Sequence, residues 1–210
     1  MRGPHNLWRL IRTGATFERT GAMAIVLEGF GTPPGLRIAA RLIGWPFKWL
    51  GLRGDPALPP VTRALTALGP AYIKFGQTLA TRPDIVGDEM ALQLKYLQDK
   101  LPPFATSLAR EMVAVELGVP VDEVFSAFSE PVAAASIAQV HKARLALDGR
   151  EVAVKVLRPG IEKAFRKDID AFYFAARTIE LLAPFARRLR PMDVITHFEG
   201  VVAGELDLRL

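Results

Sequence analysis

The feature that most constrains the fold of this chain is the Asp148-Gly149 pair, which lies between two stretches of alternating side chains. Glycine accepts a positive φ without steric cost, so an Asp-Gly pair favours a tight turn, and alternation on both sides is typical of a β-hairpin. The sequence therefore predicts antiparallel strands over residues 139–147 and 151–157. A further strand is predicted over residues 132–137, which completes a small three-stranded sheet.

The last of these strands carries a lysine. Val152, Val154 and Val156 share one face of the strand, because successive side chains point to opposite sides, so Lys155 lies on the other face. A lysine among small and branched residues, just after a hairpin, is the context in which protein kinases hold nucleotide phosphates. A solvated lysine on a surface strand would show the same pattern, so these residues alone leave both interpretations open.

An alanine-rich segment is centred on Ala135, twenty residues before the lysine. Its members are Val132, Ala133, Ala134, Ala135, Ser136, Ile137, Ala138, Gln139 and Val140. A kinase would place its glycine-rich loop here, and small side chains still let backbone amides approach a phosphate, with the Ser136 hydroxyl as a further donor. Alanine is less free than glycine at positive φ, so the loop should be stiffer. The alternative is a plain alanine-rich strand end.

Helical signals lie on both sides of this sheet. Helices are predicted over residues 61–81, with a break at Gly69-Pro70, and over residues 88–99, 106–117 and 120–128. The predicted caps are Asp88, then Thr106 or Ser107, and Gly118 at a C-terminus. Residues 1–60 contain many glycines and prolines and are predicted to be loosely structured.

After the sheet, apolar residues recur every three or four positions, which predicts a long amphipathic helix. They are Ile161, Phe165, Ile169, Phe172, Ala176, Ile179 and Phe185. A final helix is predicted from Asp193. Helices, a short antiparallel sheet and then helices indicate the α+β fold class.

Composition excludes several classes of site. The 27 Lys and Arg exceed the 22 Asp and Glu by five, but they form no stripe interleaved with aromatic residues, so we expect no nucleic-acid partner. Without cysteine there is no disulfide or thiolate chemistry. His5, His141 and His197 lack ligand spacing, so we expect no metal site in this chain, and any metal ion to be held by oxygen ligands and phosphate.

Membrane contact is left open by the sequence. No stretch reaches the roughly 18 apolar residues of a spanning helix, and no signal peptide is evident, so a cytoplasmic chain is the first expectation. However, residues 36–52 place Trp45 and Trp49 one turn apart, with Arg37, Arg41 and Lys48 between apolar residues. Such a segment suits a membrane interface, and it equally suits an amphipathic helix packed on a core and broken at Pro46.

Two more short motifs complete an ordered set. Lys74-Phe75-Gly76-Gln77 lies on the helix after the Gly69-Pro70 break, and Glu205-Leu206-Asp207 lies near the end of the sequence. Together with the alanine-rich segment through His141 and Val152-Ala153-Val154-Lys155, this set resembles the UbiB (AarF-type) family of atypical kinase-like proteins, which serve ubiquinone biosynthesis. Residues 68–83 are similar to that family's extension helix, and the resemblance covers residues 58–210.

The resemblance implies a protein-kinase-like N-lobe preceded by a helical extension, with ATP or ADP and Mg²⁺ as cofactors. Lys155 would be the catalytic, phosphate-positioning lysine, and residues 132–140 would form the nucleotide-binding loop. Lys74 would pair with Glu205 and Asp207, and together with Gln77 would form a regulatory latch between extension and core. The latch helix would cover the site where peptide substrates dock in ordinary kinases, which favours a lipid-like partner.

The resemblance also implies three segments, which are a possible membrane-surface segment over 1–57, the helical extension over 58–128 and an incomplete N-lobe over 129–210. A partner glutamate, the catalytic and metal-binding aspartates and transmembrane anchoring helices are expected beyond Leu210, so this chain alone should not transfer phosphate. Expected partners are nucleotide, a membrane surface, prenylated quinone precursors and other quinone-biosynthesis proteins, at the cytoplasmic face of the inner membrane.

Two rival functions follow. Some family members are named polyprenylphenol hydroxylases, but nothing in the sequence would bind flavin or iron, so that name reads as pathway association. A non-catalytic, membrane-associated scaffold or regulator of quinone-biosynthesis enzymes is the alternative to an ATP-dependent enzyme.

Overall fold

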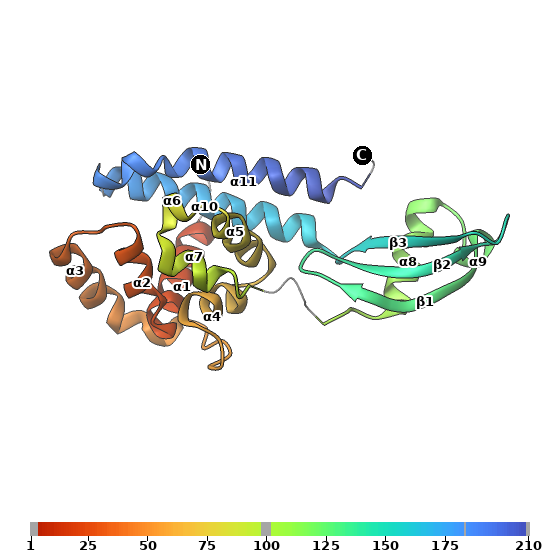
Figure 1. The fold of residues 1–210 in the computed structure, drawn as a ribbon, viewed down its shortest axis with the longest axis horizontal. Helices are drawn as coiled ribbons and strands as arrows, with labels where there is room; N and C mark the ends of the chain where they lie inside the picture. Colours follow the sequence, from red (N-terminus) through yellow and green to blue (C-terminus); the bar gives the residue numbers. More distant parts are fainter. Residues whose placement is uncertain (1–3, 98–101, 183, 209–210) are drawn as a thin grey trace. The chain divides into compact units, whose positions relative to one another are not determined.

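The computed structural model describes residues 4–97, 102–182 and 184–208. The α+β class is confirmed, with helices and one three-stranded antiparallel sheet. The chain divides into two compact units, which are a helical unit, Met1–Gln98 with Glu162–Leu210, and a sheet unit, Asp99–Ile161 (Figure 1). This division groups the helices after the sheet with the N-terminal helices, whereas the sequence interpretation placed residues 129–210 in one segment.

The helical unit begins with elements that the sequence interpretation missed. They are α1 (Pro4–Thr20), α2 (Ala22–Gly29), α3 (Pro34–Gly44) and the 3₁₀ helix η1 (Trp45–Leu50). The prediction of a loosely structured region was therefore wrong for residues 4–50, whereas residues 51–59 form no helix or strand, as predicted. The misleading glycines and prolines lie at helix ends, where Gly21 adopts a φ of 82° before α2 and Pro34 occupies the first position of α3.

Residues 36–52 include most of α3 and all of η1. The helix does end at Gly44, and η1 begins at Trp45 just before the predicted break at Pro46. However, neither α3 nor η1 contains a buried residue, so the alternative of a helix packed on a core is wrong.

The next helices are short and closely follow the predicted breaks. They are α4 (Pro60–Leu68), α5 (Pro70–Ala80), α6 (Pro83–Val86) and α7 (Asp88–Leu94). Gly69, with a φ of 113°, ends α4 and begins α5, which confirms the break at Gly69-Pro70. Asp88 is the first residue of α7 and not its cap, because Gly87 occupies the N-cap position. The helix ends at Leu94, and the predicted end at Asp99 lies outside the described residues.

The unit is completed by α10 (Ile161–Leu182), the 3₁₀ helix η2 (Pro184–Leu189) and α11 (Pro191–Leu206). The long helix ends at Leu182, so Phe185 of the predicted apolar stripe falls in η2. The helices α10 and α11 lie side by side (Figure 1), and the hydroxyl of Tyr173 donates to Glu199 Oε2 at 2.6 Å. Phe165 and Phe198 are almost completely buried, which places the core of the unit between these helices and α5.

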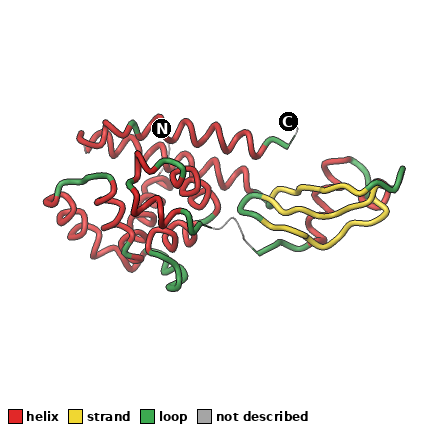
Figure 2. The backbone as a smooth tube through the Cα atoms, viewed as in Figure 1, coloured by secondary structure: helices red, strands yellow, loops and turns green. Residues whose placement is uncertain are grey.

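The sheet unit contains β1 (Phe125–Ala134), β2 (Ala138–Leu145) and β3 (Glu151–Leu157), in that order and all antiparallel (Figure 2). The third strand was predicted to the residue. The first begins seven residues before its predicted start, at Phe125, and the short α9 covers only Val121–Val124. Register shifts between Phe125 and Ala133 interrupt the alternation of side chains, which explains why a helix was predicted over this stretch.

One face of the sheet is covered by α8 (Thr106–Leu117). Ala109 and Val113 of this helix pack against Ala143 and Val156 of the strands. The helix closes at Gly118, whose φ of 72° fits the predicted C-cap. The predicted N-cap was wrong, because Ala105 precedes the helix and the Thr106 hydroxyl donates instead to Glu130.

A buried polar network lies under the same face of the sheet. Gln139 and His141 are fully buried. The Gln139 amide oxygen accepts from the Phe104 N–H at 2.9 Å, and its nitrogen donates to the Phe104 carbonyl at 3.2 Å and to His141 Nε2 at 2.9 Å. Since Nε2 accepts, Nδ1 carries the proton and donates to the Ser129 carbonyl at 2.8 Å. The network thus ties the residues before α8 to β1 and β2.

This network generates a stability prediction. Gln139→Leu replaces the amide by an apolar side chain of comparable size and leaves His141 Nε2, which is buried, and both polar groups of the part-buried Phe104 backbone without their partner. A fully buried unpaired group costs about 1–3 kcal/mol, and the part-buried Phe104 groups cost less because water reaches them. Urea denaturation of the chain should show a free energy of unfolding lower by about 2–4 kcal/mol. Leu147→Gln, at a 97% exposed position in the β2–β3 loop, is the control and should change it by no more than about 0.5 kcal/mol. Equal effects of the two substitutions would contradict the role given to Gln139.

Candidate functional site

Lys155 lies on the open face of the sheet. The three valines of β3 face α8, whereas Lys155 and its neighbour Ala153 are exposed. In the ladder Lys155 is paired with Val140 of β2, and Val140 with Ala133 of β1. Paired residues share a face, so these three residues form a row across the sheet. The ammonium group is therefore carried by a rigid strand, on the side that α8 does not cover.

The alanine-rich segment forms the β1–β2 connection. Strand β1 ends at Ala134 and β2 begins at Ala138, and the Ala135 N–H donates to the Ala138 carbonyl at 2.8 Å. Ser136 is completely buried, and Val132 is 65% exposed. The residues predicted to form the nucleotide-binding loop therefore range from fully buried to exposed. Ala133 and Val140 lie in the row of Lys155, while the Gln139 side chain points to the other face and is occupied by the network beneath it.

Arg158 helps to hold the β1–β2 connection in place, and the sequence interpretation missed it. Its Nε donates to the Ala135 carbonyl at 2.9 Å, and its Nη2 donates to the Pro102 carbonyl at 2.9 Å. Its backbone N–H donates to the Ile137 carbonyl at 2.8 Å. One residue just past β3 therefore fixes the loop at two carbonyls. The only signal in the sequence was a lone arginine before Pro159-Gly160, which carries no pattern of its own.

The second cluster lies in the helical unit, where α5 carries Lys74-Phe75-Gly76-Gln77. Lys74 Nζ lies 2.7 Å from Glu205 Oε2 of α11, with the lysine side chain mostly buried. The Gln77 amide instead points to the Leu97 carbonyl, at 3.4 Å. Asp207 follows α11 as its C-cap, and its N–H donates to the Ala203 carbonyl. The structure thus brings Lys74 and Glu205 together, while Gln77 contacts another part of the unit.

The middle residues of the motif set the packing of α5. The Phe75 ring lies 5.1 Å from the ring of Phe172 and 5.2 Å from that of Phe198. Gly76 is buried, and a Cβ at this position would lie only 2.4 Å from Leu97 Cδ1 and 2.6 Å from Leu65 Cδ1. Only glycine therefore allows the helix to approach these side chains so closely.

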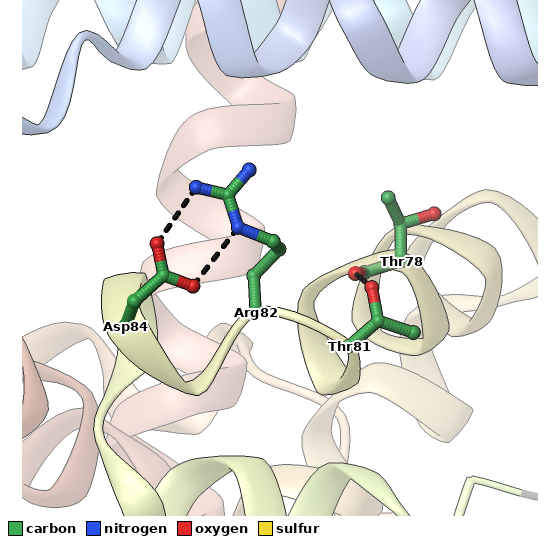
Figure 3. Close-up of polar contacts among 4 residues, drawn as sticks. All are labelled: Thr78, Thr81, Arg82 and Asp84. Atoms are coloured by element: carbon green, nitrogen blue, oxygen red, sulfur yellow. Dashed lines mark hydrogen bonds and ion pairs between the residues drawn. The ribbon is translucent and has the colours of Figure 1, made fainter.

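The C-terminal end of α5 is fixed by side chains (Figure 3). The Thr81 hydroxyl donates to the Thr78 carbonyl at 2.8 Å, and Arg82 binds both carboxylate oxygens of Asp84, at 2.9 and 2.7 Å. This hydrogen-bonded pair lowers the pKa of Asp84 and raises that of Arg82. Both groups are exposed, so the pair fixes the turn into α6 and adds little stability.

Over the described ranges, no group of three His, Asp or Glu side chains could hold a metal ion. Within the same residues, no helix combines the length and the apolar character needed to cross a bilayer.

Residues 96–210, more than half of the chain, match the family model described as ABC1 atypical kinase-like domain. The chain belongs to this family. Its three-stranded antiparallel sheet and the helices before it are consistent with a kinase-like N-lobe preceded by a helical extension.

Curated relatives of this ABC1 family member carry the name "Probable protein kinase UbiB". The chain is 41% identical over 203 residues to the protein of Pseudomonas paraeruginosa, covering 95% of the chain and 38% of that relative. It is 47% identical over 147 residues to the protein of Marinobacter nauticus, and this match covers 70% of the chain and 27% of that relative. It is 41% identical over 173 residues to the protein of Shewanella loihica, and this match covers 81% of the chain and 32% of that relative. The chain thus spans about 38% of the length of the first of these relatives, and its resemblance to UbiB proteins is confirmed.

The packing of α5 generates a matched pair of predictions. Gly76→Ala forces buried leucines to move, so we expect the free energy of unfolding to fall by about 1–3 kcal/mol. Gly200→Ala, in α11, meets no atom within 4 Å and should raise it by about 0.5–1 kcal/mol through helix propensity. Thermal or urea denaturation measures both. If the two substitutions shift the free energy of unfolding in the same direction, the close approach of α5 to the leucines is not the reason that glycine is required at position 76.

Proposed function

We propose that the complete protein is an ATP-binding atypical kinase-like enzyme, a kinase or ATPase, that supports ubiquinone biosynthesis. The observation that carries this proposal is Lys155, held on the open face of β3 in a row with Val140 and Ala133. Membership of the ABC1 family and the similarity to proteins named as probable kinases support it. The ubiquinone pathway is inferred from the similarity to UbiB proteins.

In this proposal the cofactor is ATP or ADP with Mg²⁺. The Lys155 ammonium would bind the nucleotide phosphates, as a point charge on a rigid strand can. The connection over residues 135–137 would cover them, with the Ala135 N–H kept in its bond to the Ala138 carbonyl and the following backbone amides facing the phosphates, and Arg158 would keep it in place through the Ala135 carbonyl. Within the described residues no carboxylate cluster holds a metal, so Mg²⁺ would come with the phosphates and with ligands elsewhere in the complete protein.

The Lys74–Glu205 ion pair would act as the regulatory latch. Lys74 is mostly buried, and a charge in that position depends on its partner more than an exposed one does. Opening the pair would free the α5 helix from α11, while the Phe75 contacts would oppose that movement. Gln77 and Asp207 would support the two helix segments through backbone contacts.

We also propose the partners and the location. The complete protein would work at the cytoplasmic face of the inner membrane, with prenylated quinone precursors and other quinone-biosynthesis proteins as partners. A second candidate function, a non-catalytic membrane scaffold, is favoured by one observation, which is the exposure of Trp45 and Trp49. Nucleotide affinity separates the two candidates.

The first test concerns Lys155 in the complete protein. Lys155→Ala removes the charge that binds phosphate, and a charge-assisted contact of about 1.5–3 kcal/mol corresponds to a Kd raised roughly tenfold to a hundredfold. Thermal shift with Mg²⁺ and ATP should lose most of its nucleotide-dependent stabilisation. Lys142→Ala is the control, because Lys142 is paired with Ala153 and so lies on the same face. Unchanged stabilisation in Lys155→Ala, or equal loss in both variants, would sink the assignment.

The second test concerns the latch. Lys74→Met and Glu205→Gln each remove one member of the pair, and the double variant removes both. In the complete protein we expect altered nucleotide preference or turnover in each single variant. The double variant should add nothing further, because both substitutions break one interaction. Circular dichroism reports whether the fold is retained. Additive effects, or loss of fold without a change in nucleotide preference, would reject the latch.

A further inference from the structure

The most unusual surface of the described chain lies on α3 and η1. Seven large apolar side chains within fourteen residues are between 49% and 71% exposed. They are Leu36, Ile38, Leu42, Ile43, Trp45, Phe47 and Trp49, and we call them the α3–η1 surface. Folded domains rarely present so dense an apolar cluster to water, and such patches usually mark a contact site.

The orientation of α3 explains this exposure. Arg37, Ala40 and Gly44 recur at helical spacing and are half-buried against the rest of the unit. The opposite side carries Ile38 and Leu42, which face solvent. Arg37 is also held on the inner side by Glu28, at 3.6 Å. The helix is thus inverted relative to an ordinary surface helix, since its apolar side faces outward.

Backbone contacts hold η1 in place and leave its large side chains free. The Arg19 guanidinium donates to the Trp49 carbonyl at 3.1 Å and to the Gly51 carbonyl at 2.7 Å. The Leu52 N–H donates to the Thr16 hydroxyl at 3.0 Å. A Cβ on Gly51 would lie 2.3 Å from the Ala15 carbonyl oxygen, so the backbones of η1 and α1 are in direct contact. The side chains of Trp45, Phe47 and Trp49 remain between 50% and 70% exposed beside this attachment.

The charge of the chain is concentrated on the same segment. Residues 1–57 contain eight Arg and Lys against three Asp and Glu, and residues 58–210 contain nineteen of each kind. The whole surplus of five positive charges therefore falls in the segment that bears the α3–η1 surface. Arg41 and Lys48 are exposed beside the apolar side chains, and the Lys48 ammonium lies 5.7 Å from the centre of the Trp45 ring.

We infer that the α3–η1 surface docks onto the interface of a bilayer containing anionic phospholipid. Tryptophan rings and long cationic side chains are the groups that favour the headgroup layer, with apolar side chains below them. The positive surplus matches a negative lipid surface, which an uncharged protein partner would not require. This inference deepens the proposed function by naming the surface through which the protein meets its membrane, and it needs no nucleotide.

Vesicle flotation tests this inference. The 210-residue chain should bind vesicles of phosphatidylcholine with phosphatidylglycerol, and bind pure phosphatidylcholine much less, because each cation near an anionic surface contributes about fivefold in affinity. Trp45→Glu with Trp49→Glu should abolish binding. Arg41→Gln with Lys48→Gln should lower it at least tenfold and remove most of its dependence on salt. Leu147→Glu, an exposed site in the sheet unit, is the matched control and should bind as the unchanged chain does.

Three outcomes would overturn the inference. The first is no binding to anionic vesicles by a chain that circular dichroism shows to be folded. The second is binding that the paired tryptophan substitutions leave intact, since another surface would then be responsible. The third is sedimentation showing self-association that these substitutions abolish, with no lipid binding, which would assign the surface to a second copy of the chain. Failure here would leave nucleotide binding by Lys155 untouched, so the two proposals fail separately.

Discussion

The helical unit depends on the missing side chain at Gly76. Because this position has no Cβ, α5 lies against Leu65 and Leu97 at a distance that any other residue would increase. That position of α5 brings the ring of Phe75 onto Phe172 and Phe198. It also lets Lys74 meet Glu205 of α11. A short motif that looks ordinary as a helical segment therefore sets packing, aromatic contact and charge pairing at once, through Gly76, Phe75 and Lys74.

The two faces of the sheet differ in how they are packed. Under α8, apolar side chains and the hydrogen-bonded pair of Gln139 and His141 form a closed interior. A fully paired buried polar group specifies one arrangement of its neighbours, since any other leaves it unpaired. On the other face the strands carry Lys155 together with Ala153, Val140 and the ion pair of Lys142 with Glu151, and α8 does not cover them. A rigid interior thus holds an open surface in a fixed shape, as a phosphate site requires.

What the sequence predicted correctly was local. The third strand, the face of Lys155 and the break at Gly69 follow from turn chemistry and alternation, which a few adjacent residues determine. The failures had non-local causes. Register shifts in β1 interrupted its alternation, and the hold of Arg158 on Ala135 joins residues 23 positions apart, so no spacing rule reveals it. The pairing of Lys74 with Glu205 was reached through family resemblance, because helix periodicity does not say which helices meet.

The α3–η1 surface shows a further limit of periodicity. An amphipathic pattern states that one side of a helix is apolar, but not whether that side faces the core or the solvent. Here the inner side is made of Ala40, Gly44 and the half-buried Arg37, so the helix lies against the unit on small residues, and its large side chains remain outside. Exposing them to water is unfavourable. An anionic interface would remove that cost and also satisfy the nearby cations, so the burial pattern and the charge distribution lead independently to the same partner.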